Sequence, residues 1–260
     1  MRIAIIGFGK MGKFFANILK NDHSLFVYDI DREKTKNADI KDGIIAKDIE
    51  EITEFNPHLV INAVSLKNTI PVFKQLEEFI SPKTTIGDIA SVKGEIIRYY
   101  NDTKNPFFSI HPMFGPTFAD LKKLKNECVV IIEESDKKAK DFFKTLFEKL
   151  GLKVFNFSLE EHDKTMAYSL TLPFVATFIF AGCIDIKTVP GTTFKKHLEI
   201  AKGLLSEDNY LLSEILFNKY SVKEINKVQS QLEYLKHIIN QKDGELAFDY
   251  LDKLRKNIEE

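Results

Sequence analysis

The chain has 260 residues, of which 44% are hydrophobic and 29% charged, a composition typical of a globular protein with one large domain or two ordinary ones. Its 37 basic and 38 acidic residues give a net charge of -1, so no long-range electrostatic attraction draws it to nucleic acid or to an anionic membrane. We therefore expect neither nucleic acid nor a membrane among its partners.

The two cysteines and the apolar runs indicate the cellular compartment of the protein. Cys128 and Cys183 lie far apart and have no partners at metal-ligand spacing, so we expect two small buried side chains and no metal. The longest apolar stretch, LTLPFVATFIFAGCI, has 15 residues interrupted by a proline, too short to span a bilayer, and predicts a buried helix. The N-terminal apolar run is too short for a signal peptide. We expect a cytoplasmic protein.

Short apolar runs alternate with amphipathic stretches over residues 1–157. The amphipathic stretches, such as KAKDFFKTLFEKLG, carry apolar residues at helical spacing. Near-continuous apolar strands alternating with helices indicate a parallel sheet covered on both faces. The expected strands are IAIIG (3–7), LFVYD (25–29), HLVINAV (58–64), TTIGDI (84–89), FFSIH (107–111), CVVIIE (128–133) and LKVFNF (152–157).

Beyond residue 157 the pattern is helical only. Helices are expected over 160–182, 193–217, 222–240 and 243–258. The sequence thus predicts an α/β domain over 1–157 and an all-helical domain over 158–260. Several helices have apolar faces, more than one layer could bury against the first domain. A homodimer formed through the helical domain would cover them.

A G-x-G-x-x-G motif follows the first strand and opens a helix. This context fits a dinucleotide pyrophosphate, because the backbone approaches closely and the helix N-terminus supplies free N–H groups. The candidate cofactor-binding residues of this turn are Gly7, Phe8, Gly9, Lys10, Met11 and Gly12.

An acidic residue ends the next strand. Asp29 lies seventeen residues after Gly12, where a carboxylate can accept hydrogen bonds from both ribose hydroxyls and repel a 2′-phosphate. The sequence therefore favours NAD over NADP, although Arg32 could bind a phosphate. Val64 and Asp88, at the carboxyl ends of later strands, are further candidates for cofactor contact.

Two segments place polar side chains at the carboxyl ends of neighbouring strands. In GDIASVKGEI (87–96) Ser91 lies in a turn and Lys93 begins a helix; in FFSIHPMFGP (107–116) Pro112 holds His111 at a strand exit. An imidazole can accept a hydroxyl proton near neutral pH, and a serine can orient that hydroxyl. This pair suits hydride removal from an alcohol carbon. Alternatively, Ser91 is a helix N-cap.

These segments carry a resemblance to the prephenate/arogenate dehydrogenase family. The matching elements are IAIIGFGKMG, DIASVKG, HPMFGP and EEHDKTMAYSL, in order over most of the chain. The resemblance implies a Rossmann domain followed by a helical dimerisation domain, and NAD(P)-dependent oxidative decarboxylation of prephenate or arogenate. It implies that His111 takes the hydroxyl proton and that Ser91 hydrogen-bonds near the same hydroxyl.

Three positions depart from the family pattern. Thr117 stands where an acidic residue is common, Phe174 where a histidine is common, and Gly203 near the expected substrate-carboxylate arginine. Lys195, Lys196 or Lys202 could bind a carboxylate instead, as a point charge without the fork of arginine. The substrate-binding candidates are Ser91, Lys93, His111, Thr117, Lys195 and Lys202.

Two other functions remain open. One is another two-domain oxidoreductase, of the 3-hydroxyacid dehydrogenase or imine reductase type, in which HPMFGP would have no role. The other is a regulatory module that binds NAD without turnover. The loss of the expected arginine and second histidine favours the regulatory module, whereas the joint presence of Ser91 and His111 disfavours it.

Overall fold

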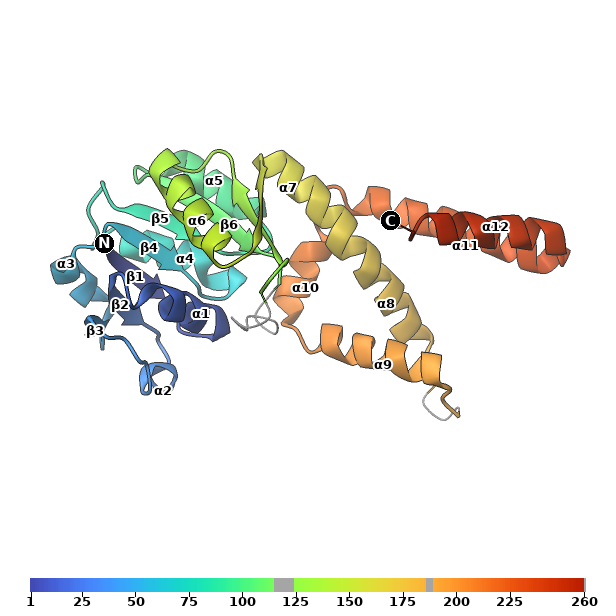
Figure 1. The fold of residues 1–260 in the computed structure, drawn as a ribbon, viewed down its shortest axis with the longest axis horizontal. Coiled ribbons are helices and arrows are strands. Elements are labelled where there is room, and N and C mark those ends of the chain that lie inside the picture. The colour runs from blue at the N-terminus through green and yellow to red at the C-terminus, as the bar shows by residue number, and fades with distance from the viewer. Residues whose placement is uncertain (115–123, 186–188, 260) are drawn as a thin grey trace. The chain divides into compact units, whose positions relative to one another are not determined.

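The computed structural model describes residues 1–114, 124–185 and 189–259. They divide into two compact units (Figure 1). The first unit comprises Met1–Met166 and Asn209–Glu214; the second comprises Ala167–Asp208 and Ile215–Glu260. The domain boundary expected after residue 157 stays a prediction.

The first unit is built on an eight-stranded sheet with the order β3-β2-β1-β4-β5-β6-β7-β8. Its strands are β1 (Arg2–Ile6), β2 (Ser24–Tyr28), β3 (Gly43–Ile45), β4 (Leu59–Asn62), β5 (Thr85–Asp88), β6 (Phe107–Pro112), β7 (Cys128–Ile132) and β8 (Lys153–Phe157). Its helices are α1 (Lys10–Leu19), α2 (Arg32–Thr35), α3 (Ile52–Phe55), α4 (Leu66–Leu76), α5 (Gly94–Asp102), α6 (Lys137–Lys149) and α7 (Leu159–Met166).

The prediction of an all-parallel sheet is wrong at one strand. β7 runs antiparallel to β6, pairing His111 with Val130, whereas the other neighbours are parallel. An apolar run shows that a strand is buried on both faces but carries no sign of its direction. β3 was not expected, because its three residues are all exposed and show no burial pattern.

Alternate side chains of the strands enter two cores on opposite faces of the sheet. In β1, Ile3 and Ile5 pack with α1 and α6, and Ala4 and Ile6 pack on the other face. The first core contains Phe14, Phe15, Phe108, Phe143 and Phe147, and the second contains Phe26, Phe73, Ile86, Tyr99 and Tyr100. The sheet with its two helical layers forms a Rossmann-like domain (Figure 1).

The glycine turn fixes where α1 begins. Gly7 has a φ of +91°, and a Cβ there would lie 2.7 Å from the backbone carbon of Ala63. A Cβ on Gly12 would lie 2.0 Å from the Gly7 carbonyl oxygen. Any side chain at either position would push the helix away from the strand ends, so the motif serves close approach of backbone to backbone.

The second unit is helical in the residues that the structure describes. It contains α8 (Leu172–Cys183), α9 (Thr192–Leu205), the end of α10 (Asn209–Leu216), α11 (Ser221–Gln241) and α12 (Gly244–Lys256). The single helix expected over 193–217 is broken between α9 and α10. α8 packs against α9 and α11.

A π-helical turn, Ala167–Thr171, precedes α8. Pro173 has no N–H to donate to the carbonyl of Ser169, and the backbone widens where that hydrogen bond is lost. The Thr171 hydroxyl lies 2.8 Å from that of Ser221 at the start of α11. The turn is thus joined to a neighbouring helix by a buried polar pair.

Two expectations about burial in this unit are wrong for the single chain. α8 has no buried residue, although a buried helix was expected, and Cys183 is exposed. Cys128, in the first unit, is half-buried. The continuous helix Leu159–Cys183 is long and apolar enough to cross a membrane by length and composition alone, with 17% of its most apolar window buried.

Replacing Phe143 by alanine tests the first core. The Phe143 ring is fully buried and lies 4.6 Å from the Phe108 ring and 5.8 Å from the Phe147 ring, centroid to centroid. We expect Phe143→Ala to lower the free energy of unfolding by about 3–5 kcal/mol, measured by urea denaturation. Phe155→Ala is the matched control, because Phe155 is 41% exposed. Equal losses in the two variants would contradict this packing.

Candidate active site

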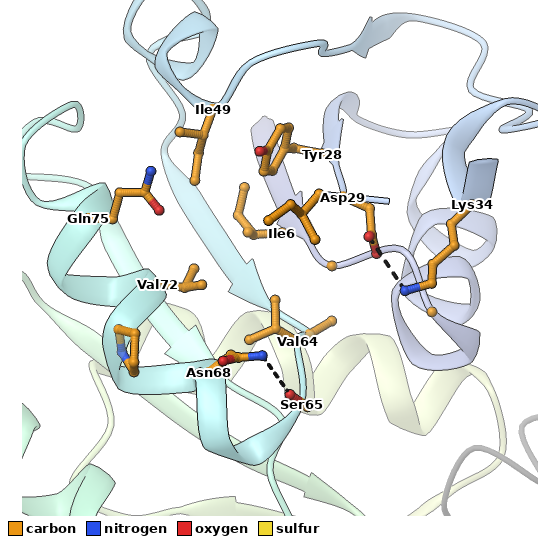
Figure 2. A pocket seen from close by; sticks show the side chains of 15 residues that line it. Ile6, Tyr28, Asp29, Lys34, Ile49, Val64, Ser65, Asn68, Val72 and Gln75 are labelled. Atoms are coloured by element: carbon orange, nitrogen blue, oxygen red, sulfur yellow. Dashed lines mark hydrogen bonds and ion pairs between the residues drawn. The ribbon is translucent and has the colours of Figure 1, made fainter. Parts of the chain in front are cut away.

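A cavity of about 460 Å³ opens at the carboxyl ends of β1, β2 and β4 (Figure 2). Gly7 and Gly9 line it beside Asp29, and Val64 faces them from the connection between β4 and α4. Figure 2 shows Asn68 turned toward Ser65, with which it makes a 3.0 Å hydrogen bond. The cavity combines an apolar floor with a glycine turn and one carboxylate, which suits a nucleoside.

Asp29 is the polar centre of this cavity. Its Oδ2 accepts a hydrogen bond from the Phe8 N–H at 2.6 Å, and its Oδ1 accepts one from the Asp31 N–H at 2.8 Å. The Lys34 amine lies 3.5 Å from Oδ1 and lines the cavity. Lys34 was missed from the sequence, where REK indicates only a solvated helix. Arg32, which was expected here, lies 3.8 Å from Asp48 instead.

The remaining turn residues occupy different surroundings. The Phe8 ring is buried in the first core, and Met11 packs against that core. Lys10 is the first residue of α1 and is exposed. Of these three residues, only Phe8 contacts Asp29, through its backbone N–H.

A buried ion pair lies at the ends of β5 and β6. The Lys93 amine is 2.5 Å from Asp88 Oδ2 and donates a second hydrogen bond, of 2.8 Å, to the Ile110 carbonyl. Asp88 Oδ1 accepts a hydrogen bond from the Tyr100 hydroxyl at 2.8 Å. The side chains of Asp88 and Lys93 have 0% exposed surface. Their expected contacts with cofactor and substrate stay predictions.

The residue after Ile110 is His111, and it meets a second histidine. His111 Nδ1 lies 3.1 Å from Nε2 of His162, which is the fourth residue of α7. His162 Nδ1 lies 3.6 Å from an oxygen of Asp163, a distance too long for a normal hydrogen bond. All three side chains are buried. The sequence placed His162 and Asp163 in the family-like segment EEHDKTMAYSL, with the start of a helix as the simpler interpretation, and did not predict this contact.

The surroundings favour the neutral form of both imidazoles. Burial lowers the pKa of His111 well below its ordinary 6.5, and the charges of His162 and Lys93 lower it further. Burial also lowers the pKa of His162; Asp163 opposes this shift and Lys93 adds to it. A neutral imidazole at neutral pH is the form that accepts a proton.

Ser91 lies half-buried in the bend between β5 and α5. Its alternative role as helix N-cap is wrong, because α5 begins at Gly94 and Lys93 occupies the cap position. Since β5 and β6 are adjacent parallel strands, Ser91, which follows β5, and His111, near the carboxyl end of β6, lie at the same edge of the sheet.

The other substrate candidates belong to the second unit or lie outside the described residues. Lys195 and Lys202 are exposed on α9 of the second unit, and Lys202 pairs with Glu199 at 3.0 Å. Thr117 lies outside the described residues. Phe174 packs against Phe178 in α8, and Gly203 is exposed in α9. Among the described residues no group of three His, Cys, Asp or Glu side chains could hold a metal ion.

Comparison with known proteins decides the family. Residues 15–156 match the family model for the nucleotide-binding domain of prephenate dehydrogenase. The chain belongs to the prephenate/arogenate dehydrogenase family. A solved prephenate dehydrogenase from Aquifex aeolicus, in complex with hydroxyphenyl propionate and NAD+, has 24% sequence identity, with a TM-score of 0.84 over 99% of this chain and 96% of that one.

Two curated relatives are similar to this chain over part of their length. Arogenate dehydrogenase 1, chloroplastic, from Arabidopsis thaliana is 25% identical over 63% of this chain and 27% of its own. The T-protein of Enterobacter agglomerans is 24% identical over 84% of this chain and 57% of its own. The chain thus spans between about a quarter and just over half of these relatives, which are longer proteins.

The buried histidines of this family member make its stability depend on pH. In the unfolded chain His111 and His162 take up protons near pH 6.5, whereas in the folded protein their pKa values are lower. We therefore expect the free energy of unfolding to fall as the pH drops below 6.5, by up to about 1.4 kcal/mol per pH unit for each histidine. Urea denaturation between pH 7.5 and 5.5 measures this slope.

His162→Gln removes one of the two groups and should flatten that slope. His237→Asn, which replaces an exposed histidine on α11, is the control and should leave it unchanged. A wild-type slope of zero over this range would show that the imidazoles are not held neutral.

Proposed function

We propose that the protein is an NAD-preferring dehydrogenase that oxidatively decarboxylates prephenate or arogenate. The observation that carries this proposal is His111, a buried imidazole held neutral at the same sheet edge as a dinucleotide turn. Family membership and the hydroxyphenyl propionate and NAD+ complex of the Aquifex relative support it.

The cofactor fits the residues present. Gly7 and Gly12 leave no room for a Cβ, so the phosphate turn is closely packed, and Asp29 lies in the cavity at the end of β2. Bound there, the nicotinamide would supply the hydride acceptor. Asp29 would accept hydrogen bonds from the ribose hydroxyls, which favours NAD. Lys34 beside it reduces the repulsion of a 2′-phosphate, so we expect NADP to be used less well rather than excluded.

His111 would accept the proton of the substrate hydroxyl as hydride leaves the same ring carbon. Carbon dioxide leaves from the opposite ring position, and the ring becomes aromatic, which drives the step. Ser91, following the neighbouring strand, would orient the hydroxyl. Lys195 or Lys202 would bind a substrate carboxylate in place of the arginine that the sequence lacks at position 203.

The assay of this function mixes the purified chain with NAD or NADP and with prephenate or arogenate, and follows the absorbance of the reduced cofactor. We expect reduction with at least one substrate, and faster with NAD than with NADP. Measurable NAD binding without reduction in any of the four mixtures would contradict the proposal and leave the NAD-binding regulatory module as the function.

His111→Asn tests the proton acceptor. Asparagine keeps a polar group but cannot take a proton, so we expect kcat to fall about 10²–10⁴-fold with the Kd for NAD unchanged. His58→Asn is the control, because His58 is exposed and precedes β4 at the amino end of the sheet. Full activity in His111→Asn would show that another group accepts the proton.

We also propose that the chain forms a homodimer through its helical unit. Large apolar side chains are exposed along its helices, among them Ile200 (60%), Val222 (66%), Ile239 (63%) and Phe248 (68%). Single exposed apolar residues are ordinary on a monomer, but this many on α8 to α12 indicate a covered surface. α8 has no buried residue in the single chain and is a further part of this apolar surface.

Light scattering coupled to gel filtration measures this assembly. We expect a particle of twice the mass of one chain, and a shift toward the monomer in Ile239→Asp, because a carboxylate at an apolar interface is costly to bury. Ile44→Asp in β3 of the first unit is the control and should remain dimeric. A monomeric wild-type protein at micromolar concentration would refute the dimer.

A further inference from the structure

The contact between His111 and His162 imposes a choice of proton positions. His111 Nδ1 and His162 Nε2 are 3.1 Å apart, so one nitrogen carries a proton and the other accepts it. If His162 donates, His111 carries its own proton on Nε2 and has no lone pair left for a substrate. If His111 donates from Nδ1, its Nε2 is a free acceptor. Only the second arrangement makes His111 a base.

Asp163 decides between the two arrangements. When His162 accepts at Nε2, its proton is on Nδ1, which faces an oxygen of Asp163 at 3.6 Å. In the opposite arrangement the Nδ1 lone pair would face the carboxylate, which is repulsive. This nitrogen is buried and has no hydrogen-bond partner among the described residues, so the carboxylate is the group that distinguishes its two states.

The start of α7 holds His162 against the sheet. The Leu159 N–H donates to the Glu134 carboxylate at 3.1 Å, and the Ser158 N–H and hydroxyl both donate to Glu161 at 2.9 Å. These contacts tie the first turn of α7 to the residues around β7 and β8. His162 is therefore positioned by the same unit that carries His111.

We propose that His162 and Asp163 are positioning residues that fix the proton of His111 on Nδ1 and share the positive charge formed when His111 accepts the substrate proton. This inference rests on the proposed function. The substrate hydroxyl proton goes to His111 Nε2, and the Nδ1 proton can pass to Nε2 of His162, whose other ring nitrogen, Nδ1, faces the Asp163 carboxylate. No bond to carbon is involved, and the imidazole pair gains one proton in all.

The other charges around the pair oppose and limit this protonation. Lys93, from the β5–α5 connection, disfavours a cation on either histidine, while Asp88 beside it and Asp163 on α7 favour a cation on His162. The pair therefore stays neutral at rest and accepts a proton only with help from Asp163. Removing the carboxylate should leave burial and the charge of Lys93 opposed only by Asp88, and so lower the pKa of His162 further.

Nitrogen-15 NMR of histidine-labelled protein tests the tautomer without substrate. We expect the proton of His111 on Nδ1 in the wild type, and a shift toward the Nε2 tautomer in Asp163→Asn. A wild-type His111 with its proton on Nε2 would overturn the inference. The expected tautomer in a protein that reduces no NAD would overturn the proposed function and support the tautomer assignment.

Kinetics of matched variants provide the second readout. We expect Asp163→Asn to lower kcat about 10- to 10²-fold with little change in KM or in the Kd for NAD, and to move the acidic limb of the kcat profile to lower pH. His162→Gln offers a carbonyl that can accept from His111 Nδ1 and should retain more activity than His162→Leu, which offers none.

His58→Gln, at the opposite end of the sheet, should match the wild type. Circular dichroism and NAD binding show whether each variant is folded. If folded His162→Leu and Asp163→Asn both keep the wild-type kcat, pH profile and tautomer, the two residues have only a structural role.

Discussion

The edge of the sheet that carries the candidate active site depends on one buried ion pair, Asp88–Lys93. Two charges with no exposed surface are costly to bury, and removing either partner would leave the other uncompensated. Lys93 also donates a hydrogen bond to the carbonyl of Ile110. Ile110 lies one residue beyond the last β6 residue that pairs with β5. The pair therefore replaces strand hydrogen bonds just before His111 and fixes the backbone that presents the imidazole.

The same pair sets the charge of its surroundings. Lys93 brings a positive charge close to two buried histidines, and Tyr100 ties Asp88 to the helix that follows. The Lys93 amine thus both stabilises the backbone before His111 and supplies the positive charge near the two histidines. Burial is the main reason that the pKa values of His111 and His162 are lowered, and the fixed charge of Lys93 lowers both further.

Sequence patterns predicted the strands and strand-end residues well, because burial on both faces leaves a continuous apolar run and the chain exits at defined positions. For that reason the sequence placed Asp29 directly after β2 and His111 near the end of β6, as the structure has them. The direction of β7 and the exposed β3 leave no such pattern. His162 could not be found from spacing, since its contact with His111 joins residues 51 positions apart. Lys34 was missed because a charged helix is usually just solvated.

The hydrogen bond from the Phe8 N–H to Asp29 joins the glycine turn to the residue that we propose accepts hydrogen bonds from the ribose. The carboxylate thus stabilises the glycine turn, in addition to the cofactor selection proposed for it. Exchanging Asp29 for a neutral residue to admit NADP would loosen that loop at the same time. With the role proposed for Asp29, cofactor preference and the stability of the turn change together, and a lineage that altered the preference would need a second substitution to restore the turn.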